Sequence, residues 1–281
     1  MSTFLFKHSV DLSLLTEGFN IQTEFHKLVY SLPGGMLQHG ENRRIKVIID
    51  GEEFEAKLYN IDFDRIQYPE HPDLLQIRYS KKSPIAIKLQ TIFASDYQYL
   101  LSARQAAGPR RQIQLPEGNH DEIVFSGTMM ADVFVIDCFK GEERDSIAKE
   151  VSTMNELDFE TAFVAREDNR AGIKMVAGMK RIRQLDRSIG DSLKYLYDYR
   201  CQMTGERIGD PYNALVVEAH HIIPFTESMN NDTSNIIILS PSYHRIVHKA
   251  KPIWDENQLA FCFPNGLVEK VKLNYHLKAS K

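Results

Sequence analysis

Four histidines gathered near one end constrain this chain more than any other feature of its sequence. The chain has ten histidines, and four of them lie in one window of 29 residues: His220, His221, His244 and His248. Imidazole titrates near neutral pH and is the commonest metal ligand among side chains. We therefore expect the chemistry of this chain to be located between about residues 215 and 250.

The residues around these histidines predict a strand, a loop, a second strand and a helix. Residues 215–223 are largely apolar and lead into the paired histidines, and Pro224 ends that strand. Residues 226–235 form a polar loop by composition, and residues 236–239 form a second short strand. Ser240 then caps a helix whose first turn tolerates Pro241 and which carries the last two histidines.

This local order predicts a metal site. His244 and His248 are four residues apart on the helix, so their Cβ atoms lie about 6 Å apart on one face. Successive side chains of a strand point to opposite faces, so only one of His220 and His221 can reach the same ion. The other histidine of this pair can then serve as a general acid or base. Three imidazoles with open coordination positions are typical of a catalytic metal, and the residues alone predict a metal-dependent hydrolase with a histidine base. They leave open which bond is broken.

Four short segments resemble the HNH endonucleases of the ββα-metal superfamily. They are Cys201-x-x-Thr-Gly205, Glu218-Ala-His-His-Ile-x-Pro224, Asn235-Ile-Ile-Ile-Leu239 and His244-Arg-x-x-His248. The spacings agree as well, with 14 positions from His221 to Asn235 and 9 from Asn235 to His244. The sequence looks most like the histidine-rich branch that includes the colicin-type nucleases. The resemblance covers about residues 195–255.

The resemblance implies a role for each matching side chain. It implies that three histidines bind the metal: His220, His244 and His248. His221 would be the general base that activates water, and Asn235 would hold the loop between the strands by bonding to backbone groups. Glu218 would orient a neighbouring histidine or basic group, or would be a plain surface carboxylate. Arg245 would touch the scissile phosphate, or would be an ordinary exposed helix arginine.

The cysteines do not indicate a second, structural zinc. Many HNH proteins brace the motif with two Cys-x-x-Cys pairs, but Thr204 stands where the partner of Cys201 would be, and the second pair is also lacking. We expect no structural zinc, and a domain stabilised by packing with Cys201 buried. The cofactor that we expect is one divalent ion per active site, with Mg, Mn, Ni and Zn all open.

The rest of the chain predicts an α+β architecture in three parts: a β-rich domain at 1–140, a helical connector at 141–194 and the HNH nuclease domain at 195–281. Asp50-Gly51 predicts a tight hairpin within 43–59. Further strands are expected at 74–79, 85–89, 122–125 and 133–138, and a helix at 96–107. The connector is rich in helix-forming residues.

Basic residues outside the motif are candidates for DNA contacts. The resemblance to restriction-type enzymes assigns DNA recognition to the β-rich domain, where segment 104–114 combines Gln amides with three guanidinium groups: Arg104, Arg110 and Arg111. In the connector, three residues share one side of the expected helix and could follow a phosphate backbone: Lys180, Arg183 and Arg187. Both sets could also be solvated surface charge. Asp50, Glu55 and Lys57 superficially match another class of restriction nuclease, but the turn explains Asp50.

The net charge of −4 excludes a protein coated in positive charge. Residues 201–281 carry eight basic and eight acidic side chains, so non-specific attraction to DNA should be weak. The sequence contains no run of 18 apolar residues and no signal-like start, and we expect a cytoplasmic protein without a membrane partner.

Taken together, these features predict a DNA endonuclease of restriction or defence type, either type II or modification-dependent, that hydrolyses phosphodiester bonds in double-stranded DNA. One site cuts one strand, so a double-strand cut predicts a homodimer. Two alternatives stay open. One is a non-specific HNH toxin nuclease, and the other is a DNA-binding or effector-sensing regulator whose HNH fold is only structural.

Overall fold

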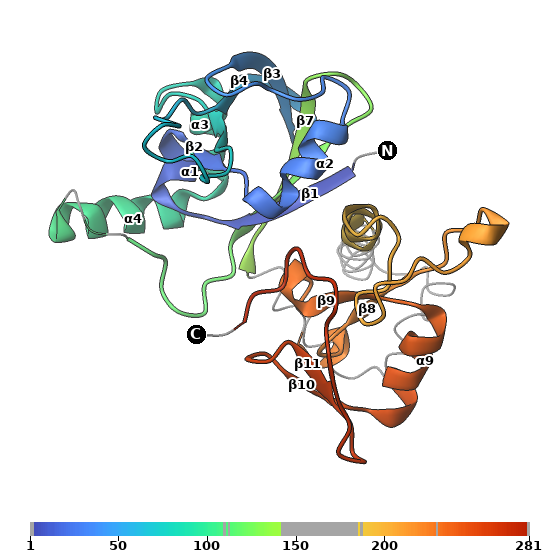
Figure 1. Cartoon of the computed structure of the whole chain (residues 1–281). Coiled ribbons are helices and arrows are strands. Elements are labelled where there is room, and N and C mark those ends of the chain that lie inside the picture. Colours follow the sequence, from blue (N-terminus) through green and yellow to red (C-terminus); the bar gives the residue numbers. More distant parts are fainter. Residues whose placement is uncertain are drawn as a thin grey trace, which may run out of the picture. The chain divides into compact units, whose positions relative to one another are not determined.

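Two units make up the computed structural model, which describes residues 3–108, 111, 113–141, 185, 188–228 and 230–279. The units are Met1–Arg144 and Asp145–Lys281. Both contain strands and helices, which confirms the α+β class (Figure 1). The predicted connector 141–194 lies almost entirely outside the described residues, although residues 188–196 are helical.

The first unit is built on a seven-stranded sheet that curls upon itself (Figure 1). The strand order is β1-β6-β7-β3-β4-β5-β2, and neighbouring strands are antiparallel except for β3 with β7. The strands are β1 (Thr3–Ser9), β2 (Gly18–Asn20), β3 (Asn42–Ile49), β4 (Glu52–Asn60), β5 (Leu75–Arg78), β6 (Glu122–Gly127) and β7 (Val133–Phe139). Although β1 and β2 are the two edges, the ring centroids of Phe6 and Phe19 lie 5.8 Å apart. The curl thus brings the edges together around aromatic side chains.

The hairpin and most of the later strands of this unit confirm the sequence predictions. Asp50 and Gly51 have φ angles of 51° and 80°, and Ile49 pairs with Glu52 across the turn. Two consecutive positive φ angles give the turn the twist that adjoining strands need. Strands β5, β6 and β7 cover the predicted ranges 74–79, 122–125 and 133–138 to within a few residues.

One strand prediction is wrong, and several elements were missed. The helices of this unit are α1 (Leu12–Thr16), α2 (His26–Ser31), α3 (Pro84–Ile92) and α4 (Ala94–Ala107), with a 3-10 turn η1 (Thr23–Phe25). Helix α4 confirms the prediction for 96–107, but α3 replaces the predicted strand 85–89. The Ser83 hydroxyl accepts from the Ala86 amide, and Pro84 occupies the first position of the helix. This N-cap stabilises a helix where the sequence had predicted a strand. The elements between Thr3 and Ser31 had not been predicted.

A buried carboxyl on α4 predicts how the stability of the first unit depends on pH. Burial, followed by the neighbouring Asp121, raises the pKa of Asp96 from 3.8 to about 6. A raised folded-state pKa contributes stability below the unfolded value, and that stability is lost as pH rises through about 6. We expect Asp96→Asn to raise the free energy of unfolding at pH 7 by about 1 kcal/mol, and to change it much less near pH 4. Urea unfolding followed by circular dichroism at both pH values measures this, and a less stable variant at pH 7 contradicts it.

The second unit contains the predicted strand, loop, strand and helix. Strand β8 (Glu218–His221) pairs antiparallel with β9 (Ile236–Leu239), and α9 (Pro241–Ala250) follows. Strand β8 is shorter than the predicted 215–223 because β9 offers it only four partners. The predicted loop contains a short helix, α8 (Phe225–Ser228), and a 3-10 turn, η4 (Thr233–Asn235).

A second sheet and an apolar core support this segment. The remaining elements are the 3-10 turn η3 (Asp210–Tyr212) and a three-stranded sheet of β10 (Ile253–Asp255), β11 (Ala260–Cys262) and β12 (Val268–Lys270), which had not been predicted. The core joins both sheets and α9 through these buried residues: Cys201, Met203, Ile237, Leu239, Val247, Phe261 and Leu277. Cys201 is fully buried, as predicted.

Two buried polar residues hold β9 on the side away from β8. The Gln202 side-chain oxygen accepts from the Ile238 amide at 2.8 Å, and the Gln202 amide donates to the Ile238 carbonyl, also at 2.8 Å. His276 Nε2 lies 2.9 Å from the carbonyls of Thr233 and Ile236, so it donates to them. The edge of β9 and the turn before it are therefore fixed by residues distant in sequence.

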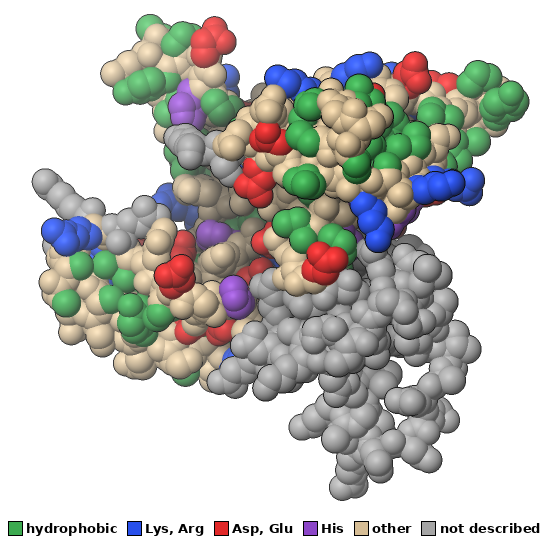
Figure 2. Space-filling model, turned by 90° about the horizontal axis from the view of Figure 1, so that it is seen from below, with side chains coloured by type: hydrophobic (Ala, Val, Ile, Leu, Met, Phe, Trp, Pro, Cys, Tyr) green, Lys and Arg blue, Asp and Glu red, His purple; other side chains and the backbone are tan. Residues whose placement is uncertain are grey.

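Charged side chains of both signs are exposed on the face that Figure 2 draws. On the described part of the face in Figure 2, blue and red side chains are interspersed, in keeping with 34 basic and 38 acidic residues. None of the helices in the described residues is both long and apolar enough to cross a membrane.

Candidate metal centre

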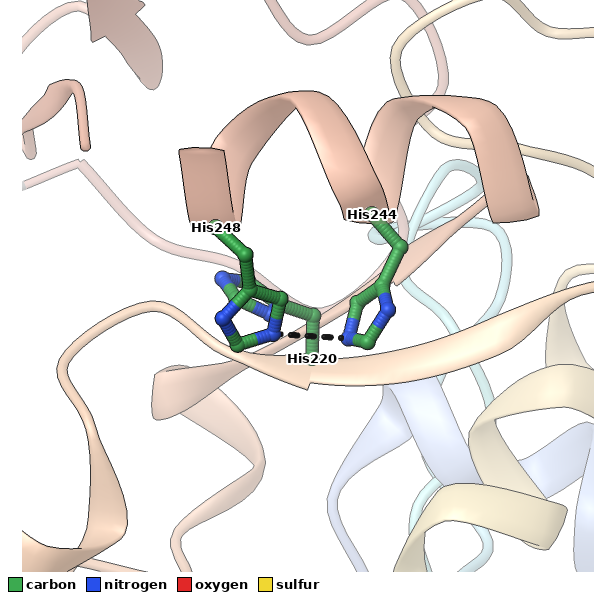
Figure 3. Close-up of side chains that lie close together, drawn as sticks. All are labelled: His220, His244 and His248. Carbon is green, nitrogen blue, oxygen red and sulfur yellow. Dashed lines mark hydrogen bonds between the residues drawn. The ribbon is translucent and has the colours of Figure 1, made fainter. Parts of the chain in front are cut away.

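Three of the four clustered histidines converge on one point. His220 comes from β8, and His244 and His248 come from α9 (Figure 3). Each offers a ring nitrogen, and these atoms all lie within 4.8 Å of one another. The Nε2 atoms of His244 and His248 are 3.2 Å apart. No other group of three or more possible metal ligands lies so close within the described part of the chain.

Local sequence explains how α9 presents its two histidines. The Ser240 hydroxyl accepts from the Tyr243 amide at 3.3 Å, and Pro241 occupies the first turn, so the helix begins at a defined residue. Val247 is buried in the core. Because Val247 fixes the rotation of the helix, the face with His244 and His248 turns toward β8.

The site keeps His220 in the form that binds metals. Burial, followed by the neighbouring His244 and His248, lowers the pKa of His220 from 6.5 to about 3. A neutral imidazole has a lone pair on one ring nitrogen, which is what a metal ligand requires. A set of three imidazoles suits a divalent transition ion, and the three residues fit such an ion.

Glu218 is placed beside this group. Its carboxylate oxygen lies 2.6 Å from Nδ1 of His244. Glu218 and His220 are two positions apart on β8, so both side chains point to the face that α9 covers. A carboxylate that accepts from Nδ1 places the proton there and leaves Nε2 of His244 for a metal. The orienting role given to Glu218 stays a prediction, and this contact is the one that it requires.

The opposite face of β8 carries His221, which is half-buried. Its Nε2 lies 3.2 Å from the side-chain oxygen of Asn231, and its ring lies 5.7 Å from that of Phe225. Asn231 is 5% exposed. Sequence reasoning had not singled out Asn231, because it stands in a run of polar residues that marks only a loop.

Asn235 bonds to the backbone in three places. Its side-chain oxygen accepts from the Ile223 amide, and its side-chain nitrogen donates to the carbonyls of Ile223 and Asn230, each at 2.9 Å. These bonds tie the end of β8 to the loop before β9. This is the type of contact that the resemblance implies for Asn235.

The remaining predicted residues lie elsewhere or outside the described residues. Arg245 is exposed on α9. In the first unit, Arg104 is half-buried and donates to the Arg111 carbonyl at 2.6 Å, while the Arg111 side chain is exposed. Glu55 and Lys57 are exposed on β4, and Asp50 is in the turn. Four predicted DNA contacts are not among the described residues: Arg110, Lys180, Arg183 and Arg187.

Comparison with known proteins agrees with this geometry. The family model described as HNH endonuclease matches residues 201–250. Neither the curated proteins nor the solved structures contain a match to the chain. The matched segment spans β8, β9 and α9 and all four clustered histidines. The chain therefore carries, in residues 201–250, a domain of the HNH endonuclease superfamily.

Proposed function

We propose that this chain is a metal-dependent endonuclease of restriction or defence type that cuts double-stranded DNA. The observation that carries the proposal is the three-histidine group on β8 and α9 with a fourth histidine adjacent to it on β8. Three imidazoles would hold one divalent ion, and open positions would remain for a phosphate oxygen.

His221 would take the proton from the attacking water. The water oxygen would then bond to phosphorus, and the bond from phosphorus to the 3′-oxygen would break. The departing 3′-oxygen would take a proton from solvent, leaving 5′-phosphate and 3′-hydroxyl ends. A divalent ion bound to His220, His244 and His248 would stabilise the negative charge that develops on the phosphate and on the leaving oxygen. Glu218 would keep His244 oriented throughout, and Arg245 would contact the phosphate from the exposed side of α9.

The first unit would supply DNA recognition, and two copies of the chain would cut both strands. Exposed Arg111 and the three connector residues Lys180, Arg183 and Arg187 are the proposed phosphate or base contacts. Mixed surface charge would keep the affinity for random DNA low. Mg, Mn, Ni and Zn are all compatible with this proposal, since imidazole binds several of them.

A cleavage assay tests this function. The protein is stripped with a chelator and incubated with supercoiled plasmid and with methylated and unmethylated genomic DNA, each metal being added separately. We expect nicked or linear product with at least one metal, no product in excess chelator, and discrete fragments. A smear would instead favour the toxin nuclease, and binding without any cleavage would favour the regulator.

A further inference from the structure

The contact between His221 and Asn231 indicates which ring nitrogen of His221 carries the proton. The side-chain oxygen of Asn231 lies 3.2 Å from Nε2 of His221. An amide oxygen can only accept, so Nε2 must donate. A neutral imidazole has one N–H group, and the lone pair is then on Nδ1.

The loop holds Asn231 in place from both sides. The Asn230 carbonyl accepts from the Asn235 side chain at 2.9 Å. The Asn230 side chain accepts from the Asp232 amide at 2.7 Å, and the Asn230 amide donates to the Ser228 hydroxyl at 3.1 Å. Asn235 also bonds to Ile223, two residues beyond His221. The asparagine of the HNH motif therefore fixes both the strand that carries His221 and the loop that carries Asn231.

We infer that Asn231 is a positioning residue that holds the His221 ring with its proton on Nε2, so that Nδ1 is the atom that receives the proton of water. The role of Nδ1 rests on the proposed nuclease function, whereas the position of the proton does not. Asn235 acts only on the backbone, and Asn231 is the link from that backbone to the ring of the base.

An asparagine suits this position because it accepts a hydrogen bond without adding charge. The side chain is 5% exposed, and a lone carboxylate would be costly to bury there. Leucine has the same number of side-chain heavy atoms as asparagine and the same branch at Cγ, but no acceptor, while aspartate keeps the acceptor oxygen. These two substitutions separate the hydrogen bond from the packing.

The experiment measures the ring tautomers by long-range ¹H–¹⁵N correlation on full-length protein labelled with ¹⁵N-histidine. Spectra are recorded with chelator at pH 8, and the His221 signals are assigned as those missing from His221→Gln. We expect the Nε2–H form in the wild type and in Asn231→Asp, and a mixture of both forms in Asn231→Leu. Ser234→Ala, an exposed change in the same loop, should leave the spectrum unchanged.

Cleavage kinetics give the second measurement. We expect Asn231→Leu to lower kcat about 10- to 100-fold with little change in KM, and Asn231→Asp to recover most of that loss. Metal affinity should stay the same in Asn231→Leu, Asn231→Asp and Ser234→Ala, because none of them removes a ligand. A wild-type His221 with its proton on Nδ1, or an Asn231→Leu protein with unchanged tautomer and kcat, overturns the inference. If the wild type cuts no DNA, the proposed function fails, while the spectra still decide the position of the proton.

Discussion

Replacement of His221 by alanine should lower the rate of DNA cleavage by about 10²–10⁴-fold, the range that a general base contributes. The side chain lies on the face of β8 opposite to His220, so its removal leaves the three convergent histidines intact. We therefore expect the affinity for the activating metal to change by less than about threefold. Mutation of a residue that does orient a metal ligand typically lowers the metal affinity about 10- to 100-fold. Cleavage rates at saturating metal and calorimetric titration of the metal measure the two effects separately.

The matched control for this variant is His120→Ala, which removes an exposed histidine of the first unit. It should change neither the rate nor the metal affinity. Retained nicking by His221→Ala would exclude His221 as the base. Loss of metal binding in His221→Ala would instead mean that His221 belongs to the ligand set.

Replacement of His244 by alanine should have an equally large effect, but through the metal. The change removes one of the three ligand nitrogens. It also removes the imidazole whose Nδ1 lies 2.6 Å from the Glu218 carboxylate. Mutation of a residue that only orients a metal ligand, as Glu218 would, lowers the metal affinity about 10- to 100-fold. We expect the loss of a ligand to exceed this range and to abolish cleavage at metal concentrations that saturate the wild type.

Two further variants distinguish this effect from general damage to the helix. Glu218→Gln keeps the ligands and should weaken metal binding within the 10- to 100-fold range. Lys249→Ala changes an exposed residue of α9 and should leave metal affinity and circular dichroism unchanged. Wild-type metal affinity in His244→Ala would contradict the proposed ligand set.

Local signals predicted the elements around the site. Pro224, the Ser240 cap and Pro241 each act on residues within one turn or one strand, so β9 and α9 were placed correctly from the sequence. The same reasoning failed at α3, where the short apolar run 85–89 fits both a strand and a helix. It also missed the three-stranded sheet β10-β11-β12, whose strands have only three residues each.

The supporting contacts could not be predicted, because each depends on the path of the chain far from the residue concerned. Gln202 meets Ile238 across 36 positions, and His276 meets Ile236 across 40. Asn231 is only ten positions from His221, but the contact depends on how Asn235 folds the loop between them. From the sequence, such residues can be recognised as polar, but the groups to which they bond cannot be predicted.

By itself, the sequence determined that three histidines of the window can meet and that the fourth must face away. Helical spacing and strand alternation are properties of the backbone, and they operate wherever the elements form. Only the tertiary structure decided that Glu218 contacts His244, that Asn231 contacts His221, and that Gln202 and His276 bond to β9. These contacts decide the orientation of each ring. They depend on packing between distant segments, because a side chain has many rotamers until neighbouring atoms exclude all but one.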